Sequence, residues 1–110
     1  MYSKELTKGT LQPIILTLIN SKGRMYGYEI TQEVKKMTSG KIDISEGALY
    51  PILHKLEAKN VLETEKVFIG KRVRKYYRVT KEGKEMVETV TEEINDFIET
   101  LTLIFNSKTA

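Results

Sequence analysis

The spacing of the apolar residues changes twice along this chain, and the order of these changes restricts the fold more than any other feature. Helical spacing comes first, in three segments that cover residues 10–21, 28–37 and 45–60. Two alternating runs follow, VLETEKVFI and RVRKYYRVT, with Gly70 between them. Helical spacing then returns from Lys81 to about Asn106. Since period-3.6 spacing predicts helices and period-2 alternation predicts strands, we expect a mainly α (α+β) chain of three helices, a β-hairpin and a long last helix.

Local signals mark the ends of the first two helices. Thr10 is predicted to be the N-cap of the first helix, which places Pro13 in the first turn, where its missing N–H does no harm. Gly40 is predicted to end the second helix, since glycine commonly follows the last helical turn. The segment SKGRMYG is predicted to be the turn between the two helices.

The third helix is predicted to have two distinct faces. Ser45 is the expected N-cap, although Asp43 with Glu46 would also form a capping box. Pro51 lies beyond the first turn, where it should cost about 3 kcal/mol or bend the helix. The predicted core face consists of Leu49, Ile52, Leu53 and Leu56. The opposite, outward face consists of Gly47, Tyr50, Pro51, His54, Lys55 and Ala58.

Basic residues gather in the hairpin, although the net charge of the chain is only +3. The span from Lys66 to Arg78 holds six basic residues and no acid. Residues 81–110, by contrast, contain three basic and seven acidic side chains. Alternation in the second strand predicts a packed face of Val73, Lys75, Tyr77 and Val79, and an exposed face of Arg72, Arg74, Tyr76 and Arg78. So much positive charge on one exposed face predicts a polyanionic ligand.

The order of the elements is that of a winged helix-turn-helix, in which the third helix enters the major groove and the hairpin wing rests on the flanking backbone. We therefore expect a winged DNA-binding domain over residues 1–80 and a dimerisation helix over residues 81–110. Apolar residues of the last helix repeat at alternating intervals of three and four, which favours packing against a second helix. The predicted dimer contacts are Leu11, Ile15, Val87, Val90, Ile94, Phe97, Leu101 and Ile104.

Three segments resemble the PadR-like family of transcriptional regulators. They are YGYEI at 26–30, ISEGALYPILHKLEAKNVL at 44–62 and RKYYRVTKEGKE at 74–85, and together with TLQPIILTLI they cover almost the whole chain. A single helix after the hairpin is similar to the short subfamily. The resemblance implies a prokaryotic homodimer that binds a pseudo-palindromic operator, usually as a repressor.

The resemblance also implies functional residues. It assigns DNA contact to Tyr28, to the start of the third helix and to the basic residues of the wing. Combined with the two outward faces, the candidate DNA-binding residues are Tyr28, Ser45, Gly47, Tyr50, His54, Lys55, Lys71, Arg72, Arg74, Lys75 and Tyr76. Some family members bind aromatic effectors at the dimer centre, which implies an effector site near Phe97 and Ile98. The tryptophan that serves as a stacking platform in one branch is absent from this sequence.

Several of these features have a plainer interpretation. A basic strand is often only a solvated face, and Tyr28 could simply pack against the third helix. His54 is either a surface residue or a phosphate or base contact. The apolar stripe of the last helix could close on the chain's own first helix. A winged domain can also serve as a protein-interaction module without binding DNA, which is the alternative function.

Other classes of protein are disfavoured by the inventory of residues. The sequence has no cysteine, one histidine and no glycine-rich phosphate loop, so we expect neither an enzyme, nor a metal site, nor a cofactor. No apolar run approaches the length of a membrane span, and the N-terminus lacks the apolar core of a signal peptide. We therefore expect a cytoplasmic protein with no membrane partner.

Overall fold

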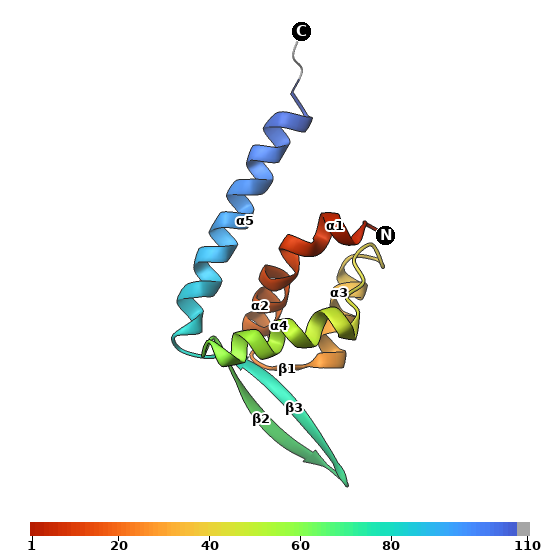
Figure 1. The fold of residues 1–110 in the computed structure, drawn as a ribbon, viewed down its shortest axis with the longest axis vertical. Coiled ribbons are helices and arrows are strands. Elements are labelled where there is room, and N and C mark those ends of the chain that lie inside the picture. The colour runs from red at the N-terminus through yellow and green to blue at the C-terminus, as the bar shows by residue number, and fades with distance from the viewer. Residues whose placement is uncertain (108–110) are drawn as a thin grey trace.

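The order of helices and strands is the predicted one, with short additions. The computed structural model describes residues 1–107. Its helices are α1 (Lys4–Thr7), the short 3₁₀ helix η1 (Lys8–Thr10), α2 (Leu11–Lys22), α3 (Gly27–Met37), α4 (Glu46–Ala58) and α5 (Gly83–Phe105). Its strands are β1 (Met25–Tyr26), β2 (Leu62–Ile69) and β3 (Arg72–Val79). The wing, β2 and β3, and the long helix α5 project in opposite directions from the helical domain (Figure 1). The predicted mixed winged-helix fold is confirmed.

The predicted helix boundaries hold at all three positions, but at Thr10, which directly precedes α2, the side-chain capping bond is missing. Ser45 caps α4, because its hydroxyl accepts a hydrogen bond from the Ala48 N–H at 3.2 Å. Gly40 follows α3 in the left-handed region at φ 79°, and its N–H donates to the Lys35 carbonyl at 2.8 Å. Thr10 is not a side-chain cap, because η1 runs directly into α2 and leaves no extended residue there. Its hydroxyl instead donates to the Thr7 carbonyl at 2.7 Å.

The strand β1 was not predicted. Its two residues, Met25 and Tyr26, pair antiparallel with Tyr77 and Tyr76, so that β3 lies in the middle of a three-stranded sheet ordered β1-β3-β2. A strand of two residues is too short to show alternation, which is why the sequence pattern gave no sign of it. Its consequence is that Arg24 and Tyr26 lie beside the base of the wing.

One hydrophobic core lies between α2, α3, α4 and the base of the sheet. Its fully buried side chains are Ile15, Leu16, Ile19, Met25, Ile30, Leu49, Leu53, Leu56, Leu62 and Tyr77. Two residues predicted to contact a dimer partner belong to this core instead. Ile15 is 0% exposed and Val87 is 5% exposed, because the first turns of α5 pack against α2 within the same chain. Neither side chain has surface left for a second copy.

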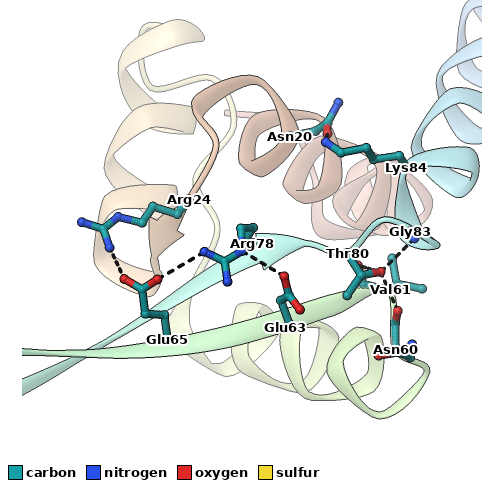
Figure 2. A network of polar contacts seen from close by, with 10 residues as sticks. All are labelled: Asn20, Arg24, Asn60, Val61, Glu63, Glu65, Arg78, Thr80, Gly83 and Lys84. Carbon is teal, nitrogen blue, oxygen red and sulfur yellow. Dashed lines mark hydrogen bonds and ion pairs between the residues drawn. The ribbon is translucent and has the colours of Figure 1, made fainter.

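A polar junction attaches α5 to the winged domain. The Thr80 hydroxyl donates to the Asn60 carbonyl at 2.7 Å and accepts from the Gly83 N–H at 2.8 Å (Figure 2). Gly83 lies so close to Val61, the residue before β2, that a Cβ atom there would overlap the Val61 main-chain carbonyl. Lys84 also donates to the Asn20 side chain on α2 at 3.2 Å. These contacts fix the direction in which α5 leaves the domain.

Candidate nucleic-acid interface

Helix α4 presents an exposed face of small, basic and aromatic residues. Leu49, Leu53 and Leu56 are fully buried on its inner side. The predicted outward residues are exposed, except Tyr50, which is half-buried; the exposed ones are Gly47, Pro51, His54, Lys55 and Ala58. The helix continues through Pro51, whose missing N–H leaves the Gly47 carbonyl without its helical donor. The exposed N-terminal part of α4 therefore combines this carbonyl with the N–H groups of a helix start, of which those of Ala48 and Leu49 bond to Ser45.

Tyr50 is held in place by the preceding helix. Its phenol ring lies against Gly27 at the start of α3, where any Cβ atom would overlap the Tyr50 hydroxyl and come within 2.8 Å of ring carbon Cζ. The rings of Tyr50 and His54 have their centroids 6.2 Å apart. Gly27 was not singled out from the sequence, although it lies in the segment YGYEI. Tyr28, next to it, is 60% exposed and so is not simply packed against α4.

The tip of the wing extends beyond the helical domain. Gly70 makes the turn at φ 64°, and Lys71 and Arg72 are both exposed beside it. The prediction that one face of the second strand packs on the domain holds only at its base. Tyr77 and Val79 are buried there, whereas Val73 is 52% exposed because the hairpin has left the domain at that point.

Lys75, a candidate DNA contact, has a partner within the chain. Its ammonium group lies 3.4 Å from the Glu57 carboxylate of α4 and 5.3 Å from the centroid of the Tyr77 ring. Partial burial alone would lower the pKa of Lys75, but the nearby Tyr77 and Glu57 outweigh it, and the pKa is raised. Lys75 therefore faces α4, and its charge is partly neutralised.

The opposite, outer face of the hairpin contains acids as well as arginines. Arg78 forms ion pairs with Glu63 at 2.9 Å and with Glu65 at 3.2 Å, and Glu65 also pairs with Arg24 (Figure 2). The hydrogen bond and charge of Glu63, followed by those of Glu65, raise the pKa of Arg78. The span from Lys66 to Arg78 is free of acids in sequence, but β2 places two glutamates opposite it in the sheet. The basic surface is therefore narrower than the sequence suggested.

Arg74 and two tyrosines complete this outer face. The guanidinium carbon of Arg74 lies 4.0 Å from the centroid of the Tyr26 ring, and that of Arg24 lies 4.3 Å from the centroid of the Tyr76 ring. The two rings meet edge to face, with centroids 5.5 Å apart and an interplanar angle of 77°. Within residues 1–107, Arg74 forms no ion pair. An exposed helix face beside a hairpin with unpaired cations suits a duplex nucleic acid.

The Transcriptional regulator PadR-like family matches residues 15–89 of this chain. The chain belongs to this family. An uncharacterised protein of Lysinibacillus sphaericus is 40% identical to this PadR-like regulator over 96 residues, which are 84% of this chain and 85% of that protein. The resemblance inferred from the sequence motifs is thereby confirmed.

Solved structures agree with this family membership. A transcriptional regulator from Clostridium thermocellum has a TM-score of 0.84 at 27% identity, over 96% of this chain and 99% of that one. Bacillus subtilis PadR, solved in complex with operator DNA, has a TM-score of 0.67 at 26% identity, over 74% of this chain and 46% of that one. The PadR-like chain is a transcriptional regulator and not an enzyme.

A second, apolar surface of the PadR-like chain lies along α5. A groove of about 320 Å³ opens where Ile94 of α5 faces Ile14 and Leu18 of α2 and Met37 of α3. Of the predicted seam residues, Leu11, Val90, Ile94 and Leu101 are half-buried, and Phe97 and Ile104 are exposed. Ile98, the other predicted effector residue, is 53% exposed. Large apolar side chains therefore remain uncovered on this helix when the chain is alone.

Within residues 1–107, no three histidine, cysteine or acidic side chains are grouped to bind a metal ion. Over the same range, no helix combines the length and the apolar character that crossing a bilayer requires.

Proposed function

We propose that this PadR-like regulator binds double-stranded DNA, with α4 in the major groove and the wing along the flanking backbone. The observation that supports this most is the division of α4 into a fully buried leucine face and an exposed face that begins with Ser45 and Gly47. Small residues at the start of a helix let its backbone approach base edges, and its N–H groups can bind a phosphate. The B. subtilis relative solved with operator DNA supports the same ligand.

Within this proposal the candidate residues have different tasks. Tyr50 and His54 reach base edges, and Ser45, Gly47 and Tyr28 lie against the backbone beside them. Lys71 and Arg72 at the wing tip, with Arg74, contact phosphates, while Tyr76 orders the wing. Lys55 adds positive charge at the far end of the exposed face of α4. Lys75 contributes less, because Glu57 already neutralises part of its charge.

We further propose that the regulator is a homodimer and a repressor. Several apolar side chains of α5 beyond Val90 remain exposed in one chain, among them Phe97, Ile98 and Ile104. A two-fold axis would let two such helices cover each other. The groove beside Ile94 is lined by residues of α2 and α5, so a partner helix bound in it would bury apolar side chains of both helices. Two recognition helices would then lie about one DNA turn (~34 Å) apart, on a pseudo-palindromic operator. In this proposal residues 81–110 serve dimerisation and residues 1–80 serve DNA binding. The regulator acts in the cytoplasm.

A small aromatic effector is the last part of the proposal. A compound between the long helices, near Phe97 and Ile98, would change the spacing of the two wings and release the operator. The uncovered apolar surface of α5 and the groove of about 320 Å³ support such a site. Calorimetry against planar aromatic compounds should show binding with a negative heat-capacity change. If no compound binds the protein and none releases it from the operator, the effector is removed from the proposal. The DNA-binding function stands in that case.

The test of the main proposal is a mobility shift on the DNA upstream of the protein's own coding region, with random DNA of equal length as control. We expect a specific complex that weakens steeply with added salt, because phosphate contacts release counterions. A transcription assay with and without the protein then tests repression. Equal, weak binding to both DNA fragments would contradict sequence-specific recognition, and no binding to either would favour a protein-interaction module.

A further inference from the structure

The three arginines on the outer face of the hairpin base do not have equal freedom. Arg24 and Arg78 are both paired with Glu65, and Arg78 is also paired with Glu63 (Figure 2). Arg74 forms no ion pair among residues 1–107, and its guanidinium lies over the Tyr26 ring. One guanidinium therefore keeps its charge available, and one aromatic ring restricts where it can go.

We propose that Tyr26 is a positioning residue that presents Arg74 to a DNA phosphate, an inference that rests on the proposed DNA-binding function. Tyr26 lies in β1, directly before α3, and pairs with Tyr76 of the neighbouring strand β3. Neither the recognition helix nor the wing contains it. Through its contact with Arg74, the residue thus joins the start of α3 to the wing.

The geometry of a stacked guanidinium explains how this positioning works. Stacking on Tyr26 occupies the flat face of the Arg74 guanidinium, while its edge carries the N–H donors. The neighbouring Tyr76 side chain engages this edge and raises the pKa of Arg74, and the remaining donors can bind a phosphate. A free arginine side chain loses rotamer freedom when it binds, whereas one already held over a ring loses less. Tyr26 therefore raises the affinity for DNA without touching the DNA itself.

The remaining residues of the network keep the stack in place. Tyr76 meets Tyr26 edge to face, and Arg24 lies over Tyr76 while paired with Glu65. Glu65 and Glu63 also hold Arg78 along the base of the wing. In this arrangement the two glutamates withhold Arg24 and Arg78 from phosphates, so that Arg74 is the arginine of this group that contacts DNA.

A double-mutant cycle tests the link between Tyr26 and Arg74. Operator affinity is measured over a range of salt concentrations for Tyr26→Leu, Arg74→Ala, the double variant and Tyr26→Phe, with thermal unfolding as the check on folding. Arg74→Ala should lower the salt slope by about one unit. Tyr26→Leu should weaken binding about two- to fivefold, the size expected for losing an exposed cation–π contact, and should cause no further loss once Arg74 is absent. Tyr26→Phe keeps the ring and should behave as the wild type.

The outcomes separate this inference from the proposed function. If Tyr26→Leu weakens binding equally with and without Arg74, Tyr26 does not act through Arg74 and the inference is wrong. If Arg74→Ala leaves the salt slope unchanged while Lys71→Ala lowers it, the inference is also wrong, but DNA binding stands. If the wild-type protein binds no DNA, the proposed function itself fails.

A second arm tests the role assigned to the glutamates. Replacing both by glutamine, Glu63→Gln with Glu65→Gln, should release Arg24 and Arg78, raise affinity for random DNA and make the salt slope steeper by up to about two units. An unchanged slope in a variant that folds normally would show that the glutamates do not withhold these arginines from DNA.

Discussion

Helices α4 and α5 are both amphipathic, but within one chain only α4 has its apolar face covered by the other elements. The leucines of α4 are fully buried by α2, α3 and the sheet, and what remains exposed is polar, basic or small. Beyond its first turns α5 has no such cover, and Leu103 and Phe105 are 75% and 79% exposed. Since burial of apolar surface is the main favourable contribution to folding and association, the exposed face of α4 suits a polar ligand and that of α5 suits an apolar partner.

The largest expected effect comes from adding charge to the open face of α5. Ile94→Glu with Leu101→Glu should convert the protein to a monomer, because burying the carboxylates against a second helix is unfavourable. Losing the second DNA-binding domain should weaken operator binding about 10²- to 10⁴-fold, since the two sites no longer bind as one unit. Sedimentation equilibrium and a mobility shift measure the two effects.

The matched control adds the same charge to polar, exposed positions of α5, Thr89→Glu with Thr100→Glu. This variant should remain a dimer and bind the operator nearly as the wild type does. A wild-type protein that is monomeric at micromolar concentration and still binds its operator tightly would contradict the dimer.

A smaller effect is expected at the junction that joins the two regions. Gly83→Ala would place a methyl group against the Val61 main-chain carbonyl, and the nearby Thr80 hydroxyl leaves it little room to adjust. Overpacking of this kind costs about 1–3 kcal/mol in the free energy of unfolding, measurable by urea denaturation. Gly9→Ala is the control, because nothing lies within 4 Å of its added Cβ atom. Equal stability of the two variants would show that the junction tolerates a shift of α5.

The exposed face of α4 gives the next prediction. Tyr50→Ala should weaken operator binding by about 1–3 kcal/mol while changing random-DNA binding little, if Tyr50 contacts a base edge. Gly27→Ala should act in the same direction, because it displaces the Tyr50 ring from α3. If Lys71 contacts a phosphate, as proposed, Lys71→Ala should weaken binding to both DNAs alike. Equal losses on both DNAs for Tyr50→Ala would remove Tyr50 from base recognition.

The sequence predicted those parts of the fold that depend on patterns of many residues. The leucine face of α4, the cap at Ser45 and the hairpin turn at Gly70 each follow from local spacing or backbone preference. The two-residue strand β1 could not be predicted, because pairing with β3 and not its own pattern creates it. The burial of Ile15 and Val87 was missed for a related reason. A heptad pattern shows that a helix needs a partner, but it does not say how much of the stripe α2 already covers.

The charge of the candidate site was predicted less completely, because basic residues of the hairpin pair with acids on other elements. Lys75 and Arg78 both belong to a span without acids, yet each has a glutamate beside it in the structure. Glu57 and Glu63 stand nine and three residues before this span, and the hairpin register brings Glu63 opposite Arg78. Hairpin pairing counted back from Gly70 could have placed Glu63 and Glu65 on the arginine face.

The smallest expected effect separates Lys75 from the unpaired cations of the wing. Lys75→Ala should weaken DNA binding less than Lys71→Ala, because Glu57 already neutralises part of the Lys75 charge.

Lys75→Ala should also reduce the free energy of unfolding near neutral pH by roughly 0.2–1 kcal/mol, the usual range for a partly exposed ion pair. The folded-state pKa of Lys75 is raised above its ordinary value of 10.5, so this contribution is fully present below pH 10.5 and is lost as the pH rises through the raised pKa. Urea denaturation of both proteins at neutral and alkaline pH checks the sign. A stability difference that grows above pH 10.5, or a loss of DNA affinity as large as that of Lys71→Ala, would mean that Lys75 is not held by Glu57 in solution.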